Sequence, residues 1–97
     1  MQNENSVYIG DKPTMNYVLA CLTLFHSGFR NVIIKARGMN TSKAIVTAEL
    51  VRTKFSNKIC IKDIKTGIET VKGKNGKVRN IGVITIILSM EKEGMDV

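Results

Sequence analysis

The chain is short of several residue types, and each shortage excludes a class of protein. Its 97 residues include one histidine, one proline, two cysteines and no tryptophan. No run reaches the ~18 apolar residues of a membrane-spanning helix. The start, "MQNENSVYIG", lacks the basic and apolar regions of a secretory signal. We therefore expect a cytoplasmic protein that does not act on a membrane.

Groups that carry catalysis or hold metals are also scarce. Cys21 and Cys60 lie in separate apolar stretches without a CxxC spacing or a histidine partner, which favours core thiols over a disulfide or a metal site. His26 falls in the last turn of a predicted helix, where the helix dipole favours a cation. Glu49 and Glu69 have no evident partner for acid–base work. We expect no enzyme, no cofactor and no metal.

Positive charge is what the chain has in excess. Fifteen Lys and Arg against eight Asp and Glu give a net charge of +7. A domain this basic typically binds a polyanion, nucleic acid first and an acidic membrane second, although lysines can also serve solubility alone. A chain this short closes one core, so we predict one domain over 1–97, with an ordered part at 6–90 and tails at 1–5 and 91–97.

Hydrophobic periodicity in the first half predicts two β-α units. The strand 7–10 is followed by a helix from about Pro13 to Ser27, which Gly28 ends. The strand 31–36, "NVIIKA", is apolar on both faces, which is typical of an internal strand. The second helix begins at 40–42, whose side chains offer N-cap oxygens, and ends at Asn57.

The second half predicts a long β-hairpin. The β-rich runs 58–71 and 78–90 flank Asn75-Gly76, a strong hairpin signal. At ~3.3 Å per residue each run could extend roughly 45 Å, so part of the hairpin must project. Breaks in alternation predict bulges between Ile61 and Ile64 and between Val83 and Ile84. We predict an α+β fold: a two-layer β-α-β-α-β-β sandwich with both helices on one sheet face and a protruding hairpin.

Two groups of cations indicate where a polyanion would bind. The hairpin tip carries four with no acid between them: Lys72, Lys74, Lys77 and Arg79. Such a cluster suits a phosphate backbone or a groove, and a solvated turn protected from aggregation is the alternative. At the corner "IIKARGMN", Lys35, Arg37 and Lys43 meet the start of the second helix, which favours a phosphate, and an ordinary capped loop is the alternative. Lys12 offers a similar cation at the start of the first helix.

Other nucleotide-binding patterns are missing. "GKNGK" is a turn, since a P-loop needs GxxxxGK[ST] between a strand and a helix. Neither clustered aromatic residues nor an RNP-like motif supports base stacking on the sheet.

Three segments, "VYIGDKPTMNYVLACLT", "VIIKARGMNTSKAIVTAELVRTKF" and "VITIIL", resemble the Alba family of archaeal chromatin proteins over nearly the whole chain. The resemblance implies a homodimer with a fold like the C-terminal domain of a bacterial translation initiation factor. It also implies binding of double-stranded DNA, and often RNA, with little sequence preference, and a chromosome-associated location in the nucleoid.

The resemblance also implies residue roles. The dimer body would contact phosphates through Lys12 and the Lys35/Arg37 corner, and the arms would follow the minor groove. Asn16 and Tyr17 fall at the matching helix start, where polar contacts are expected. Phe55 matches an aromatic position that the family uses where dimers meet side by side on DNA.

Three departures from the family pattern qualify those roles. Asp11 stands where the family has a lysine known as an acetylation site, which leaves Lys12 as the candidate for modification. Met39 replaces a common cation, and because Asp11 and Met39 together remove positive charge from this surface, we expect weaker and less salt-sensitive binding than is typical. "KFSN" lacks the proline usual after the phenylalanine, which puts side-by-side contacts in question.

The leading hypothesis is a dimeric, non-enzymatic protein that coats and compacts chromosomal DNA. An RNA-directed role is the alternative within nucleic-acid binding. A small nuclease would need an acid cluster that Asp63, Glu69 and Glu49 do not supply by spacing. A structural subunit that docks its hairpin on a protein is the remaining alternative.

Overall fold

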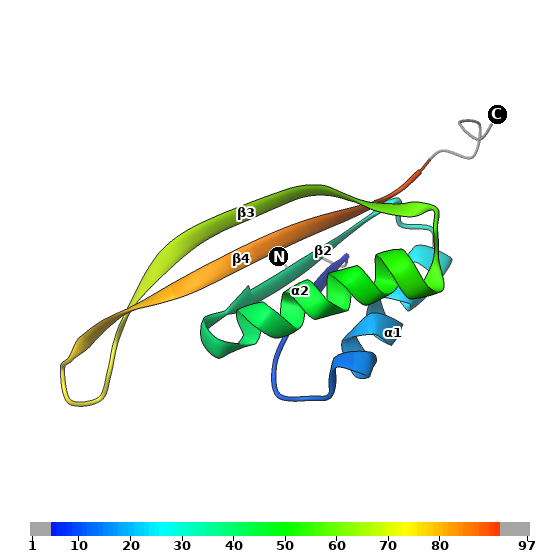
Figure 1. The fold of residues 1–97 in the computed structure, drawn as a ribbon. Coiled ribbons are helices and arrows are strands. Elements are labelled where there is room, and N and C mark those ends of the chain that lie inside the picture. The colour runs from blue at the N-terminus through cyan, green and yellow to red at the C-terminus, as the bar shows by residue number, and fades with distance from the viewer. Residues whose placement is uncertain (1–4, 92–97) are drawn as a thin grey trace.

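The elements follow the predicted order. The computed structural model describes residues 5–91, drawn in colour in Figure 1. The helices and strands are β1 (Ser6–Tyr8), α1 (Thr14–His26), β2 (Asn31–Arg37), α2 (Thr41–Leu50), β3 (Ile59–Lys72) and β4 (Val78–Met90). A 3₁₀ turn, Gly38–Asn40, leads into α2, and a π-helical turn, Val51–Phe55, extends it. The predicted tails, 1–5 and 91–97, lie outside the described residues except for Asn5 and Glu91.

The sheet has the strand order β1-β2-β4-β3, with β1 parallel to β2 and the other pairs antiparallel. Both helices cover one face (Figure 1). On that face β2 buries Val32, Ile34 and Ala36, while the side chains between them are only half-buried or exposed. The predicted two-layer α+β fold is confirmed.

The core forms where the two helices meet this face. Val18, Cys21 and Phe25 are the buried side chains of α1. From α2 the small side chains of Ala44 and Ala48 are buried, which lets the helix lie close to the sheet. Among residues 5–91, no helix combines the length and hydropathy that a membrane span requires.

The two cysteines differ in their surroundings. Burial raises the pKa of the Cys21 thiol to about 12, as expected for a core residue. The prediction was wrong for Cys60, which is only half-buried. Cys60 of β3 lies opposite Ser89 of β4, and a hydrogen bond with Glu91 raises the pKa of the Cys60 thiol.

The helix ends match the prediction at one place and contradict it at another. Gly28 adopts φ +105° immediately after Ser27, the C-cap of α1, as a C-terminal glycine should. The predicted side-chain cap of α2 is wrong, because no side chain makes a cap hydrogen bond there. Asn40 already has helical angles in the 3₁₀ turn, and Thr41 Oγ1 instead donates to the Gly38 carbonyl at 3.1 Å. The helical segment ends at Phe55 rather than Asn57.

One predicted bulge is present and the other is not. The register of β3 shifts between Ile61 and Asp63, as expected. Val83 and Ile84 instead keep continuous register with both neighbouring strands. The alternation fails there because β4 is a central strand, with apolar side chains on both faces.

The hairpin projects beyond the body because its partners end at different places. β2 pairs with β4 only from Val83 to Ser89. Residues 68–82, called the arm below, therefore extend past the rest of the sheet (Figure 1). The Gly73 carbonyl accepts a bond from the Gly76 amide at 3.0 Å, and Gly76 has φ +84°, which favours glycine in the tip turn.

Candidate nucleic-acid interface

The loop between β1 and α1 is held by Tyr17. The Tyr17 hydroxyl accepts bonds from the backbone N–H groups of Gly10 at 2.9 Å and Lys12 at 3.1 Å. A Cβ on Gly10 would lie 3.3 Å from that hydroxyl, so glycine permits the close approach. The sequence predicts a nucleic-acid contact for Tyr17, and its geometry shows a role in shaping the loop.

Lys43 holds the same loop from the other side. Its ammonium donates to the carbonyl oxygens of Gly10 and Lys12, both at 2.8 Å, and lies 5.8 Å from the centre of the Tyr17 ring. Two of its three donors are therefore engaged. Lys12 and Asn16, which this loop and helix start present, are exposed.

Lys35 and Arg37 point to the sheet face that the helices leave uncovered. Lys35 Nζ lies 5.6 Å from the centre of the Tyr8 ring. Arg37 Nη1 lies 2.8 Å from Glu69 Oε1, which comes from the arm. All four side chains line a hollow of about 450 Å³, called the sheet-face hollow below. The structure thus places Lys35 and Arg37 on one face, beside Tyr8, for which the sequence predicts no role, and Glu69, for which it predicts no partner.

The corner consists of the end of β2, the 3₁₀ turn Gly38–Asn40, the first turn of α2 and the adjoining loop 9–13, and its 3₁₀ turn packs against the base of the arm. Gly38 adopts φ +62°, a left-handed conformation that favours glycine. A Cβ there would lie 3.4 Å from Ile81 Cγ2 in the arm. Met39, which follows, is 95% exposed, and Asp11 is also exposed. Neither α1 nor α2 has a side-chain N-cap bond, so the first N–H groups of both helices have no side-chain partner.

The arm cations are arranged differently from those of the corner. All four are exposed, and within residues 5–91 none makes a side-chain hydrogen bond or an ion pair; they are Lys72, Lys74, Lys77 and Arg79. They surround the hairpin tip, at the far end of the arm from the body (Figure 1).

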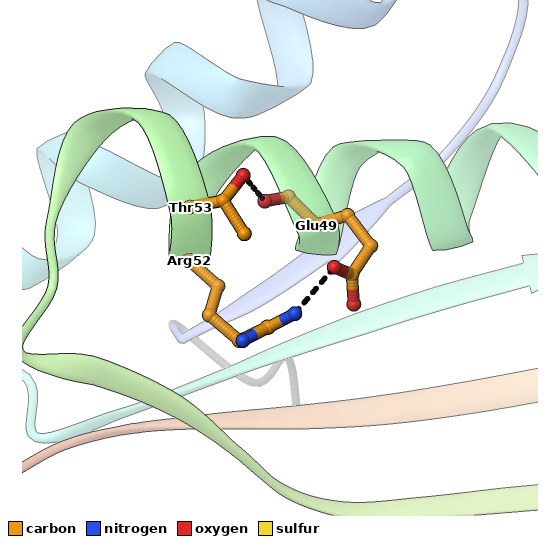
Figure 2. A network of polar contacts seen from close by, with 3 residues as sticks. All are labelled: Glu49, Arg52 and Thr53. Atoms are coloured by element: carbon orange, nitrogen blue, oxygen red, sulfur yellow. Dashed lines mark hydrogen bonds and ion pairs between the residues drawn. The ribbon is translucent and has the colours of Figure 1, made fainter.

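The opposite end of the molecule carries Phe55, which is 46% exposed at the close of the π-helical turn. A second ion pair lies on the same helical segment. Arg52 Nη2 and Glu49 Oε1 are 2.6 Å apart, and Thr53 Oγ1 donates to the Glu49 carbonyl (Figure 2). In the part of the chain that the structure describes, no three His, Cys, Asp or Glu side chains gather as a metal site.

The chain resembles known proteins in its sequence. The sequence pattern of the Alba family matches residues 5–68. Over 86 residues, 89% of this chain and 96% of the relative, the chain is 49% identical to DNA/RNA-binding protein Alba 1 of the archaeon Archaeoglobus fulgidus. The chain belongs to the Alba family. DNA/RNA-binding protein Alba of Thermoplasma acidophilum is 45% identical over 89 residues, 92% of this chain and 99% of that protein.

Solved Alba structures share the fold. Alba from Thermoplasma volcanium superposes with a TM-score of 0.82 at 44% identity, over 88% of this chain and 99% of that one. ALBA1 from Trypanosoma brucei gives a TM-score of 0.77 at 21% identity, over 99% of this chain and 76% of that one, which shows the fold alone. The matched Alba pattern ends at Ile68, where the arm begins.

Proposed function

We propose that the chain is a non-enzymatic chromatin protein that binds double-stranded DNA through its arm and the corner beside it. The carrying observation is the arm itself, which projects from the sheet with four exposed cations that have no side-chain partner among residues 5–91. The Alba relatives named as DNA/RNA-binding proteins support the class of ligand. The four arm cations would contact phosphates as the arm follows the minor groove.

The corner would orient the body on the same duplex. Lys35 and Arg37 lie at the end of β2 where its pairing with β4 stops and the arm begins, and Lys43 links the loop that carries Lys12 to the start of α2, so one duplex can contact both the corner and the arm. Asn16 can add a polar contact, and the remaining ammonium donor of Lys43 can add another. Phosphate contacts carry no base information, so we expect little sequence preference.

A second copy of the chain would complete the binding unit. Ile64 and Ile68 face the helix side of the sheet by their register, yet they are 49% and 73% exposed. Ile45, 49% exposed, lies on the flank of α2 that carries Glu49 and Arg52, away from the Lys43 flank. An apolar strip beside a polar helix flank is typical of a protein interface. A two-fold dimer through it would display two arms, a step toward compaction.

Two finer roles belong to the same proposal. Phe55 is exposed at the end remote from the arm, where neighbouring dimers on one duplex could meet. Lys12 is exposed and is the candidate for acetylation at the corner. We propose that the whole chain, 1–97, acts as one Alba domain in the cytoplasm, associated with the chromosome. RNA is the alternative ligand, and the relatives' names favour keeping it.

Fluorescence anisotropy tests the function directly. The full chain is titrated against a random-sequence DNA duplex and a structured RNA across a salt series, with sedimentation to establish its oligomeric state. We expect a dimer and tight duplex binding that weakens steeply with salt, by ~0.9 in log–log slope per phosphate contact. A shallow slope with RNA clearly preferred would instead favour the RNA role.

A further inference from the structure

The sheet-face hollow combines features that a duplex backbone does not need. It lies on the face that neither helix covers, and its volume of about 450 Å³ falls within the range of small-ligand pockets. Aromatic, cationic, anionic and hydroxyl groups line it together: Tyr8, Lys35, Arg37, Glu69 and Thr85. A surface for phosphates alone would not require an exposed ring or a carboxylate.

Tyr8 offers a ring on which a base can stack once it displaces the Lys35 ammonium, which now lies 5.6 Å from the ring centre. Its side chain is 58% exposed, while its neighbours Val7 and Ile9 are buried on the other face of the sheet. Unlike the hydroxyl of Tyr17, the Tyr8 hydroxyl makes no hydrogen bond among the described residues. Stacking on an aromatic ring contributes to single-strand binding without base selectivity, because every base has a π-face.

Phosphate-binding groups lie one position away on the same face. Tyr8 of β1 lies opposite Lys35 of β2, and Lys35 lies opposite Thr85 of β4. Neighbouring strands lie ~4.8 Å apart, so the three side chains form a row across the hollow. Arg37 is two residues beyond Lys35 on the same face. One ring and two cations at this spacing match the base and the phosphate of one nucleotide.

We propose that the sheet-face hollow binds an unpaired nucleotide of single-stranded RNA. The base stacks on Tyr8, and the phosphate replaces Glu69 as the partner of Arg37 and also contacts Lys35. The released Glu69 carboxylate accepts a hydrogen bond from the ribose 2′-hydroxyl, which DNA lacks. A duplex cannot use the ring, because its bases are stacked inside. This inference rests on the proposed function, since it places RNA on part of the same cationic surface.

The sequence predicted no base stacking on the sheet because its aromatic residues are not clustered. The structure alters that view only for one ring. A single exposed tyrosine beside two cations can hold one base, whereas a cluster is needed to hold several in succession.

The absence of tryptophan from the chain makes a direct test possible. Tyr8→Trp introduces a single indole into the hollow, and its fluorescence should fall when a short unpaired RNA stacks on it. Tyr8→Ala should weaken binding of that RNA about 5- to 150-fold, the range for losing one stacked base. Binding of duplex DNA should not weaken, because the corner and arm cations are all retained and Lys35 is released from the ring.

Matched controls separate this result from a general loss of binding. Leu19→Ala removes an apolar side chain of similar exposure from α1, away from the hollow, and this variant should bind the short RNA as the unchanged chain does. Thermal melting checks that Tyr8→Ala folds. DNA of the same sequence as the RNA should bind more weakly, and equal binding of the two would overturn the 2′-hydroxyl assignment.

The outcome also distinguishes this inference from the proposed function. If Tyr8→Ala leaves RNA binding unchanged and the introduced indole keeps its fluorescence, the hollow is not a base site, although duplex binding can persist. If the unchanged chain binds neither duplex DNA nor RNA, the proposed function fails as well.

Discussion

The corner and the arm are both cationic and lie on the same end of the molecule, but their charges are held differently. At the corner the Lys43 ammonium contacts two carbonyl oxygens, Arg37 pairs with Glu69, and Lys35 lies over Tyr8. The four arm cations make no such contacts within residues 5–91. Counting cations therefore overstates the charge that the corner can offer a phosphate. The corner cations are held in place by contacts within the chain, whereas the arm cations are exposed and available to a phosphate.

The backbone of the corner is also held more firmly than that of the arm. Buried side chains of β2 and β4 anchor the sheet below the corner, whereas residues 72–80 are all exposed. A two-stranded segment without buried apolar contacts opens more readily than the body. In the proposed complex, such an arm would be able to follow a groove whose width varies along the duplex.

Removing the arm charges should have the largest effect on duplex binding. In the variant each arm cation is replaced by glutamine: Lys72, Lys74, Lys77 and Arg79. Each lost phosphate contact lowers the log–log salt slope by ~0.9, so the slope should become shallower by about 3.6 per chain. At ~0.1 M salt the affinity should fall on the order of 10²-fold or more. Anisotropy titrations across a salt series measure both quantities.

A control with the same change in net charge tests whether position matters. Four exposed cations at the opposite end of the molecule are replaced instead: Arg30, Lys54, Lys58 and Lys62. We expect a much smaller change in slope, because these side chains lie away from the arm and the corner. If the two variants lose affinity equally, net charge rather than arm placement governs binding.

Adding charge to the corner should have an intermediate effect. Asp11 and Met39 are exposed on the loop and the turn that form the corner, and Asp11→Lys with Met39→Arg supplies two cations. The slope should steepen by up to ~1.8 per chain, because two new phosphate contacts become available. Asp11→Asn with Met39→Gln separates removal of the acid from addition of cations. An unchanged slope and affinity would show that these positions do not face the duplex.

Much of the fold could be predicted because its signals are local. Alternation, helical spacing and the Asn75-Gly76 signal gave the element order, and the length of the last two strands gave the projecting arm. The bulge near Ile61 was also visible as a break in alternation. Where the signal depends on the environment, as at Val83 and Ile84 in a central strand, the same rule predicted a bulge that does not exist.

The site was harder to predict because its partners are distant in the chain. The Arg37–Glu69 pair joins residues 32 positions apart, and the pairing of β2 with β4 and of β4 with β3 brings them together. The engagement of Lys43 depends on the path of the loop, which places carbonyl oxygens within reach of its ammonium. The exposure of Tyr8 could have been found from the alternation in "VYIG", but its position beside Lys35 required the pairing of β1 with β2.

Releasing Arg37 from Glu69 should have the smallest effect on duplex binding. It tests directly whether the ion pair at the corner limits the charge that Arg37 offers to a phosphate. Glu69→Gln removes the carboxylate that now pairs with Arg37 at 2.8 Å. Both side chains are about half exposed, so the pair is weak and a phosphate can replace it. We expect duplex affinity to rise about 1.4- to 5-fold, the equivalent of ~0.2–1 kcal/mol, and the slope to steepen by up to ~0.9.

Glu49→Gln provides the matched control, since Glu49 is similarly exposed and pairs with Arg52 on α2 (Figure 2). It removes the same charge from an ion pair outside the corner. Because Glu49 flanks the proposed dimer surface, sedimentation must show that both variants keep the oligomeric state of the unchanged chain. If Glu69→Gln then raises affinity and Glu49→Gln does not, the Glu69 carboxylate competes with the DNA phosphate for the Arg37 guanidinium. If both variants raise affinity equally, the corner responds to net charge alone, and its difference from the arm lies only in how many cations each carries.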